Sequence, residues 1–567
     1  MSKPAVQRFD YELDDSVVHD DASWKARNHA KLDMSGHWPL FVSLIGELAQ
    51  LKKIDTKNYH STMRRYARQG MPWLSKSQLQ IAYQEACDAG LLEFDKELKI
   101  RMQMKPVRSQ AGVTVVTVLT KPYACPGKCI FCPTDVRMPK SYLHDEPGAQ
   151  RAERYSFDPY KQTAGRIAAL DKIGHPTDKI ELLILGGTWS SYPRDYQEWF
   201  IKRCFDAMNA SGTDVEFETL EEAQRFNETT EHRNVGLVVE TRQDHIDADE
   251  LRWMRYLGVT KVQVGIQSMD ETVLALNKRG HDTQSTRDAF GLLRAGGFKI
   301  HGHWMPNLLG ATPDSDVADY DSLWSDVAVR PDELKIYPCM LVENAELFEY
   351  WQRGEYKPYS EQEVIDILVH CITTTPAYAR LTRVIRDIPT NNVVEGFTKA
   401  NLRQLAGNKA RKMGKRPTDI RGREIRREQV DPESLHLLTE TYETEGTIEH
   451  FLSFETGEAN DPERRIAGFL RLSFPDQAEP AVLPELADHA MIREVHVYGP
   501  ALAFGEDGKG EAQHIGLGTQ LIQKAMEMSR AAGYSRIAVI SAVGTRKYYE
   551  KHGFEKTDLY MTRELTV

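Results

Sequence analysis

The chain has 567 residues and a formal net charge of −11, and 41% of its residues are hydrophobic and 27% charged. At about 150 residues per domain this length predicts three or four domains. No apolar run approaches the ~18 residues of a membrane helix. The polar start is unlike a signal or transit peptide, so we expect neither. Seven cysteines are too few for a disulfide framework and indicate a reducing compartment, so we expect a cytoplasmic protein.

The N-terminal region, residues 1–105, is predicted to be mostly helical. Apolar residues recur at helical spacing in 37–51 and again in 75–92. Between these two segments lies a basic cluster, which predicts either a solvated helix face or a surface for a polyanion. The cluster consists of Lys52, Lys53, Lys57, Arg64, Arg65 and Arg68.

Residues 106–395 alternate short β-branched runs with helical stretches. Near-continuous apolar strands separated by helices are typical of a parallel α/β architecture. Six such strands predict a barrel or an open part of one, here a partial (β/α)6 barrel. The runs expected to form strands are 113–119, 180–185, 236–240, 261–267, 299–305 and 333–338.

Three cysteines follow the first of these strands. Cys125, Cys129 and Cys132 have the spacing C-x3-C-x2-C. Three thiolates on one tight loop can hold three irons of a 4Fe–4S cluster and leave the fourth iron open to a chelating substrate. Zinc prefers four ligands, and the nearest further donor in the sequence is His144. The spacing therefore favours an iron–sulfur cluster.

This loop after the first strand of a β/α barrel resembles the radical S-adenosylmethionine (SAM) superfamily. The resemblance implies that SAM binds the open iron and that its reductive cleavage forms a 5′-deoxyadenosyl radical. It also implies cofactor contacts at the C-terminal ends of strands: Gly186 and Gly187 follow the second strand, Glu240 and Arg242 the third, and Gln267 the fourth. A tight turn or a helix cap is the alternative explanation for each of these residues.

A basic block lies in the expected linker, residues 396–430. Its thirty residues 398–427 hold eleven Lys/Arg and two acids, a net +9, which leaves −20 for the rest of the chain. The total of −11 alone argues weakly against a nucleic-acid partner, but such a density of like charge is best relieved by phosphates. Together with Arg64 and Arg65, the expected contacts are Lys399, Lys409, Arg411, Lys412, Lys415, Arg416, Arg421 and Arg423.

Residues 431–567 show antiparallel strand signals and one strong helix. The motif Q-x-x-G-x-G opens that helix, where glycines let backbone amides approach a pyrophosphate and the helix N-terminus favours its charge. Strands are expected at 491–498 and 535–541, before and after the motif. This order resembles the GCN5-related N-acetyltransferase (GNAT) fold, an α+β domain in which the loop holds coenzyme A.

The GNAT resemblance implies a set of acetyl-CoA contacts. Glu494 could act as a general base by analogy, and Tyr548 or Tyr549 could protonate the sulfur of coenzyme A. A solvated strand carboxylate and a packed tyrosine are the alternatives. The contacts implied for acetyl-CoA are Glu494, His496, Gln513, His514, Gly516, Gly518, Thr519 and Tyr548.

Together the two halves resemble one family, the catalytic subunits of Elongator, which modify the wobble uridine of tRNA. The similarity covers almost the whole chain and is weakest in the N-terminal region, which could bind the tRNA or cover the radical site. It includes LGGTWSSYP (185–193), LKIYPCML (334–341), RVIRDIPT (383–390) and ISAVGTRKYYEKHGF (540–554).

This resemblance implies a mechanism that uses both halves. The radical abstracts hydrogen from the acetyl methyl of acetyl-CoA, the carbon radical adds to carbon 5 of uracil, and hydrolysis frees a 5-carboxymethyl group at uridine 34. Lys278 would clamp a substrate phosphate or the acetyl carbonyl, with ordinary surface charge as the alternative. Besides tRNA, a homo-oligomer or other Elongator-type subunits are the partners that it suggests.

The linker departs from the family pattern. Many members carry C-x-C-I-R-C-R-E there and bind zinc, whereas this chain reads PTDIRGRE at 417–424 and has no cysteine after Cys371. We therefore predict no structural zinc and a junction held by packing or polar contacts.

Two other functions fit part of this pattern. A protein lysine acetyltransferase with a structural iron–sulfur cluster would need no SAM, but it leaves the open cluster site and the basic block without a role. A non-catalytic RNA-binding scaffold would not need the intact cysteine and Q-x-x-G-x-G motifs.

Overall fold

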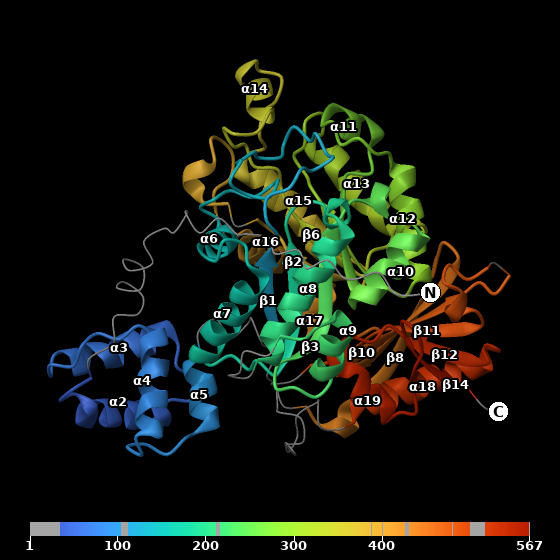
Figure 1. Cartoon of the computed structure of the whole chain (residues 1–567). Helices are drawn as coiled ribbons and strands as arrows, with labels where there is room; N and C mark the ends of the chain where they lie inside the picture. Colours follow the sequence, from blue (N-terminus) through green and yellow to red (C-terminus); the bar gives the residue numbers. More distant parts are fainter. Residues whose placement is uncertain are drawn as a thin grey trace.

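The computed structural model describes residues 34–103, 112–210, 216–386, 388–399, 401–425, 430–478, 480–498 and 516–565. Figure 1 shows an N-terminal group of helices, a central parallel sheet surrounded by helices, and a second sheet near the C-terminus. None of the described helices is both long and apolar enough to cross a lipid bilayer.

The N-terminal region is helical over its described part, with a core of its own. Asp55, Ser75 and Asp95 each accept a hydrogen bond from a backbone N–H three residues further on, which starts three of its helices. Gln103 then contacts the barrel, where its Nε2 donates to the carbonyl of Gly174 at 3.1 Å. The helices are α2 (Trp38–Gln50), α3 (Thr56–Ala67), α4 (Lys76–Asp88) and α5 (Lys96–Met102).

Seven parallel strands, each hydrogen-bonded to the next in chain order, form the central sheet. The partial barrel predicted from the sequence is confirmed, and a short seventh strand extends it beyond the six expected. That strand has only one buried apolar residue, Leu381, so its signal in the sequence is weak. The strands are β1 (Thr114–Leu119), β2 (Lys179–Leu185), β3 (Arg233–Thr241), β4 (Lys261–Gln267), β5 (Lys299–Trp304), β6 (Glu333–Ile336) and β7 (Arg380–Arg383).

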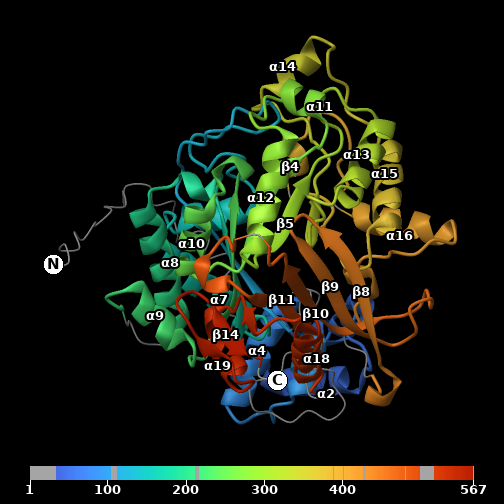
Figure 2. The same ribbon diagram turned by 90° about the vertical axis from the view of Figure 1, so that its right-hand side faces the viewer.

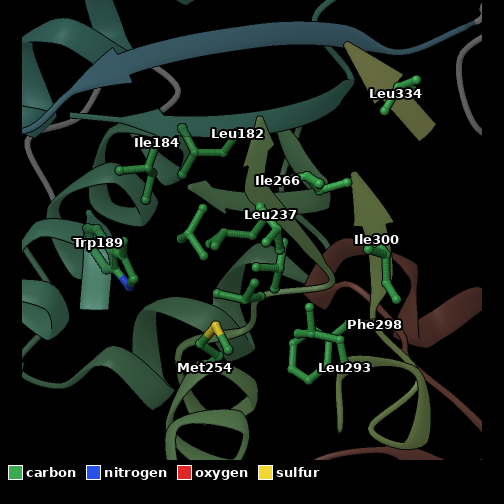
Figure 3. Packing of buried hydrophobic residues seen from close by; sticks show 14 of the residues in the cluster. Leu182, Ile184, Trp189, Leu237, Met254, Ile266, Leu293, Phe298, Ile300 and Leu334 are labelled. Atoms are coloured by element: carbon green, nitrogen blue, oxygen red, sulfur yellow. The ribbon is translucent and has the colours of Figure 1, made fainter. Parts of the chain in front are cut away.

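The outer face of this sheet is apolar and packs against the surrounding helices. Figure 3 shows Leu182, Ile266 and Ile300 from different strands beside Met254 and Leu293 from two of the helices. Side chains alternate between the faces of a strand, so every second residue faces the barrel interior. The helices are α6 (Pro147–Arg154), α7 (Pro159–Lys172), α8 (Arg194–Asn209), α9 (Leu220–Asn227), α10 (Ala248–Leu257), α11 (Glu271–Leu276), α12 (Thr283–Ala295), α13 (Pro313–Ser325), α14 (Leu347–Gln352) and α15 (Glu361–Thr374).

The basic block continues the barrel as two helices, α16 (Leu402–Lys412) and α17 (Ile420–Arg423). Leu402, Ala406 and Ala410 lie on one face of α16 and belong to the barrel core, so the first part of the expected linker packs as a helix of the barrel.

The C-terminal region contains a seven-stranded sheet in the order β13-β14-β12-β11-β10-β9-β8. Its pairs are antiparallel except for β11 and β12, which run parallel because α18 (Leu517–Ala531) connects them. This confirms the α+β fold predicted for the C-terminal domain, which also contains α19 (Arg546–Glu550). The strands are β8 (His436–Thr444), β9 (Thr447–Glu455), β10 (Ile466–Pro475), β11 (His489–Val497), β12 (Arg536–Val539), β13 (Glu555–Lys556) and β14 (Met561–Glu564).

The second sheet docks where the barrel strands begin. Figure 2 shows β10 and β11 beside the start of β5. Met491, Val543 and Tyr560 of the C-terminal domain belong to the same hydrophobic core as the barrel. At Gly544 the two domains approach so closely that a Cβ would lie 2.8 Å from the carbonyl oxygen of Asn234 at the start of β3. The two domains therefore share one core.

Candidate active site

The cysteine loop lies at the C-terminal ends of the barrel strands. Buried Ile130 anchors the loop in a small apolar cluster, and its backbone N–H donates to the carbonyl of Asn277 at 3.2 Å. Cys125, Cys129 and Cys132 are free thiols that line one cavity. This brings the three predicted ligands together.

Gly127 lies between two of the three thiols and close to Arg242. A Cβ there would lie 3.5 Å from the sulfur of Cys125 and 3.7 Å from that of Cys129, so the two thiols face a common space. The described residues contain no group of three Cys, His, Asp or Glu that could hold a single metal ion. The three free thiols on one loop are the ligand set that a 4Fe–4S cluster with one open iron would use.

Cationic side chains surround the thiols. The Nη1 of Arg279 donates to the sulfur of Cys129 at 3.5 Å, and a Cβ on Gly127 would meet Arg242 at 2.8 Å. Burial raises the pKa of Cys132 to about 11, while Arg386 and Lys140 oppose that rise. Guanidinium groups beside these sulfurs complement the negative charge that the ligands carry once they bind iron.

The Gly-Gly turn after β2 is held in a conformation that requires glycine. Gly186 has φ +141° and Gly187 has φ +83°, and the hydroxyl of Tyr192 donates to the carbonyl of Gly186 at 2.9 Å. A Cβ on Gly186 would lie 1.8 Å from the Oγ1 of Thr120, whereas one on Gly187 would meet nothing within 4 Å. Gly187 therefore presents bare backbone to the cavity that it lines.

The predicted polar residues at strand ends also line this cavity. Burial raises the pKa of Glu240, and Arg242 is fixed by an ion pair with Asp244 at 2.6 Å. Gln267 has φ +70°, a costly conformation for a residue with a side chain. Its Oε1 is buried without a hydrogen-bond partner, so the structure leaves one acceptor beside the cysteine loop for a ligand.

The barrel interior is polar, which the sequence reasoning missed. His303 bonds to the Oε1 of Gln263 at 3.0 Å, and Lys335 donates to the same oxygen. Burial lowers the pKa of His301 and of His303 well below the ordinary value, so both are neutral near pH 7. The sequence carries a signal for this interior: in 261–267 and 299–305 polar residues alternate with apolar ones at every second position. The inward residues include Lys261, Gln263, Lys299, His301, His303, Glu333 and Lys335.

The other end of the cavity lies at the start of α18. Gly516 adopts φ +71° as the N-cap of this helix, and Gly516, Gly518 and Thr519 line the cavity. The N-terminus of a 15-residue helix attracts a pyrophosphate through its free N–H groups. The first residues of the motif, Gln513 and His514, lie outside the described residues.

The two tyrosines of the C-terminal motif have different environments. A Cβ on Gly518 would lie 2.6 Å from the hydroxyl oxygen of Tyr548, which therefore faces the loop. Burial raises the pKa of Tyr548 and Thr519 opposes that rise. Tyr549 is buried against Phe554 in the core of the domain. Both tyrosines line the cavity, and Tyr548 is the one whose hydroxyl faces Gly518 of the predicted coenzyme A loop.

Glu494 and His496 lie two residues apart on β11, and both line the cavity. Glu494 forms ion pairs with Lys299 of the barrel and with Arg471, the latter at 2.9 Å. Burial lowers the pKa of His496 to about 4, and its Nε2 is buried without a hydrogen-bond partner. His496 therefore offers a neutral imidazole to the cavity.

Of the remaining predicted residues, Arg421 lines this cavity, and the others lie elsewhere. Lys278 is half-exposed, pairs with Glu346 and borders a small second hollow beside Cys129. Arg64 and Arg65 lie exposed on α3, where Arg65 pairs with Glu47.

Several residues of the basic block pair with acids elsewhere in the fold. Arg423 is buried and bonds to Glu455 at 2.7 Å, and the guanidinium of Arg421 donates to the carbonyl of Thr382. Arg411, Lys412, Lys415 and Arg416 are exposed, and Arg416 pairs with Glu463. Two more pairs are Lys399 with Glu361 and Lys409 with Asp366.

The junction at residues 417–424 is held by polar contacts. The carboxylate of buried Asp419 accepts from the backbone N–H of Leu381 at 3.1 Å and pairs with Arg403 at 3.2 Å. Arg423 adds hydrogen bonds to the carbonyls of Thr418 and Ala377. These contacts tie the junction to the barrel and to the second sheet.

Comparisons with known proteins agree with this two-part site. The family model of the Radical SAM superfamily matches residues 120–320, that of the Radical SAM C-terminal domain 331–412, and that of the acetyltransferase (GNAT) domain 509–564.

Similar proteins cover most of the chain. A tRNA uridine(34) acetyltransferase of Methanocaldococcus infernus is 41% identical over 82% of this chain and 88% of its own length. The Elongator complex protein 3 of Schizosaccharomyces pombe is 35% identical over 83% of this chain and 87% of its own. The solved structure of archaeal Methanocaldococcus infernus Elp3 with an N-terminal deletion matches with a TM-score of 0.68 at 36% identity and covers 80% of this chain and 99% of that one.

Proposed function

The chain belongs to the family of tRNA uridine(34) acetyltransferases and Elongator complex proteins 3, and from this membership we propose that it makes 5-carboxymethyluridine at the wobble position of tRNA. It is a transferase with radical SAM and acetyltransferase domains. The proposed substrates are tRNA, acetyl-CoA and SAM.

One observation carries this proposal: a single cavity joins the two sites. Its volume is about 1520 Å³, and it is lined by Cys125 and Cys129 at one end and by Gly516, Gly518 and Tyr548 at the other. Between them it passes through the polar barrel interior, about 17 Å along β5 at ~3.3 Å per residue. A shared cavity gives a reactive carbon a path between the two sites within one chain.

At the barrel end, the loop cysteines would hold a 4Fe–4S cluster, which together with SAM supplies a hydrogen-abstracting radical. The residues of this chain bind and orient. Arg242 and Arg279 would balance the charge of the cluster-bound cysteines. Gly187 would offer its backbone to a cofactor amino group, and the free acceptor of Gln267 would bind a hydroxyl or amino group.

At the other end, acetyl-CoA would bind with its pyrophosphate at the N-terminus of α18. The hydroxyl of Tyr548 faces Gly518 and has a raised pKa, so it stays protonated and can donate to a leaving thiolate. The unpartnered Nε2 of His496 can hydrogen-bond the acyl oxygen from inside the cavity.

The tRNA contacts are proposed at exposed cations. These are Arg64 on α3, Arg411 and Lys412 in the last turn of α16, and Lys415 and Arg416 just after it. For Arg421 and Arg423 the contacts at the junction support a structural role. Those same contacts support our prediction that the junction needs no zinc. Seven free thiols and a tRNA substrate fit a cytoplasmic enzyme, with a second copy or Elongator-type subunits as partners.

The test is reconstitution of the cluster under anaerobic conditions, followed by addition of tRNA, acetyl-CoA and SAM. Nucleoside mass spectrometry is expected to show carboxymethyluridine at position 34. Acetylated protein beside unmodified uridine would instead support the lysine acetyltransferase. The matched variant Cys129→Ser is expected to abolish the modification and keep the affinity for tRNA. An equal loss of tRNA affinity would give the cluster a structural role.

A further inference from the structure

An ion pair crosses from the barrel into the acetyltransferase site. Lys299 is the first residue of β5, and its Nζ donates to the Oε1 of Glu494 on β11. The other carboxylate oxygen of Glu494 accepts from the Nε of Arg471 at 2.9 Å. The side chains of Lys299 and Glu494 are 14% and 12% exposed, and both line the shared cavity. Both oxygens of the candidate general base are therefore engaged.

Lys299 is also held from its other side. Its Nζ lies 2.9 Å from Glu333 of β6, which in turn pairs with Lys261 at 3.2 Å. Burial alone would lower the pKa of Lys299, but Glu333 and Glu494 raise it above the ordinary value. Burial alone would raise the pKa of Glu494, but Lys299 and Arg471 hold it below the ordinary value. The pair is thus a fixed ammonium and a fixed carboxylate.

This arrangement conflicts with acetyl transfer to an amine. In such a transfer the amine nitrogen bonds to the acyl carbon, the carbon–sulfur bond breaks, a base takes the amine proton, and the thiolate leaves and is protonated. If Glu494 is the base, the acceptor amine must lie beside its carboxylate. That position is already filled by the side-chain amine of Lys299, whose proton blocks its lone pair.

We propose that Lys299 determines the acceptor specificity of the acetyltransferase half: it occupies the acceptor-amine position and reserves the acetyl group for a substrate in the barrel. This inference rests on the proposed function, because it requires acetyl-CoA to bind beside Gly516 and Gly518. It assigns Lys299 a chemical role, whereas a purely structural pair would only hold the two domains together.

The test uses the full chain, acetyl-CoA and ethylamine, without tRNA, SAM or iron. Lys299→Ala frees both the space and the carboxylate of Glu494 for ethylamine. Mass spectrometry is expected to show N-ethylacetamide, with free thiol released about a hundredfold faster than by the wild type, the low end of a general-base contribution. Lys299→Arg keeps a cation beside Glu494 and should stay inactive toward ethylamine.

Lys261→Ala is the matched control. Lys261 contacts Glu333 and Glu181 in the same network, but no ion pair joins it to Glu494. The Lys261→Ala variant should therefore acetylate ethylamine no faster than the wild type. An equal gain in Lys261→Ala would show general loosening of the interior and would overturn the proposal, as would a folded Lys299→Ala that binds acetyl-CoA and gains nothing.

Two further measurements keep the proposal testable if Lys299→Ala does not fold. Lys299→Met fills the volume without a charge and should speed thiol release to water. The wild type itself should bind acetyl-CoA and leave both ethylamine and a lysine peptide unmodified, so acetylation by the wild type would overturn the proposal. Absence of acetyl-CoA binding would instead contradict the proposed function, and missing uridine modification alone would leave this inference intact.

Discussion

Gly186 illustrates how one residue fixes the radical end of the site. Its turn passes so close to Thr120 that a Cβ has no room, and Thr120 cannot move aside because its Oγ1 bonds to the Tyr192 hydroxyl at 2.7 Å. The C-x3-C-x2-C spacing and the glycine pair were both readable from the sequence because they are local. The free acceptor of Gln267 was not, because it depends on how β4 packs in the barrel.

We expect Gly186→Ala to destabilise the protein by about 1–3 kcal/mol through overpacking and to weaken SAM binding. Urea unfolding and calorimetric titration with SAM measure the two effects. Gly187→Ala is the control: a Cβ there meets nothing within 4 Å, so only its positive φ costs stability. In a double-mutant cycle, Thr120→Ala should recover part of the loss in Gly186→Ala, and strict additivity would contradict the clash.

His496 makes the stability of the protein depend on pH. Burial lowers its pKa to about 4, below the ~6.5 expected for an unfolded chain. Between these values the unfolded state binds more protons, so the His496 contribution to stability falls as the pH drops from 6.5 to 4. We expect His496→Gln to flatten that part of the stability curve, measured by urea unfolding at each pH. An equally steep curve in His496→Gln and the wild type would contradict this contribution.

At the scale of elements, the basic block is less free than its sequence indicates. Five of its cations pair with acids from other elements or from the junction, namely Lys399, Arg403, Lys409, Arg416 and Arg423. The charge density was predictable from the sequence, but these partners are 16 to 47 residues away and meet the block only in the fold. Lys412 and Lys415 are exposed and have no ion pair with a described residue.

We expect charge reversal of Lys412 and Lys415 to weaken tRNA binding and to reduce the salt slope by about 0.7–0.9 per lost phosphate contact. Binding titrations across a range of salt concentrations measure both. Lys524→Glu, an exposed reversal on α18, is the control and should leave the slope unchanged. An unchanged slope in the Lys412 and Lys415 variant would remove this part of the block from the RNA surface.

Two features of the strands were not predicted from the sequence: the polar barrel interior and the seventh strand. The runs at 261–267 and 299–305 predicted strands correctly because of their β-branched residues. Their period-two polar residues were read as parts of apolar runs, although they face a cavity rather than a core. Six strands were expected, and β7 was missed because it has four residues with one buried side chain.

At the scale of the whole molecule, Asp332 connects the two sheets. Its buried carboxylate bonds to Arg493 of β11 at 2.6 and 2.8 Å and to the backbone N–H of Ile300 in β5 at 2.9 Å. A register shift between β10 and β11 falls at Arg493 and marks an irregularity in the strand there. No local pattern in the sequence predicts the contact between Asp332 and Arg493, since these residues are 161 positions apart.

We expect Asp332→Asn to destabilise the protein by about 3–5 kcal/mol, because it leaves buried arginines without their counter-charge. Burial alone would raise the pKa of Asp332, but Arg493 and Arg471 hold it below the ordinary value. Its contribution is therefore present above about pH 4 and lost as the pH falls further.

Asp558→Asn is the matched control for this prediction. Asp558 pairs with Arg252 of the barrel at 3.2 Å, and both side chains are exposed, so its loss should cost no more than about 1 kcal/mol. Urea unfolding with far-UV and fluorescence probes measures both variants. Equal effects of the two substitutions would contradict a dominant role for the buried contact.

The shared core of barrel and acetyltransferase bears on how such a chain can change over evolution. Met491, Val543 and Tyr560 have their apolar surface against the barrel, and Gly544 meets β3 without space for a side chain. Excising the C-terminal domain or exchanging it with that of another acetyltransferase would expose this surface. It would also leave buried Asp332 without its arginine partners from that domain. A substitution on one side of this contact is therefore expected to require a matching change on the other.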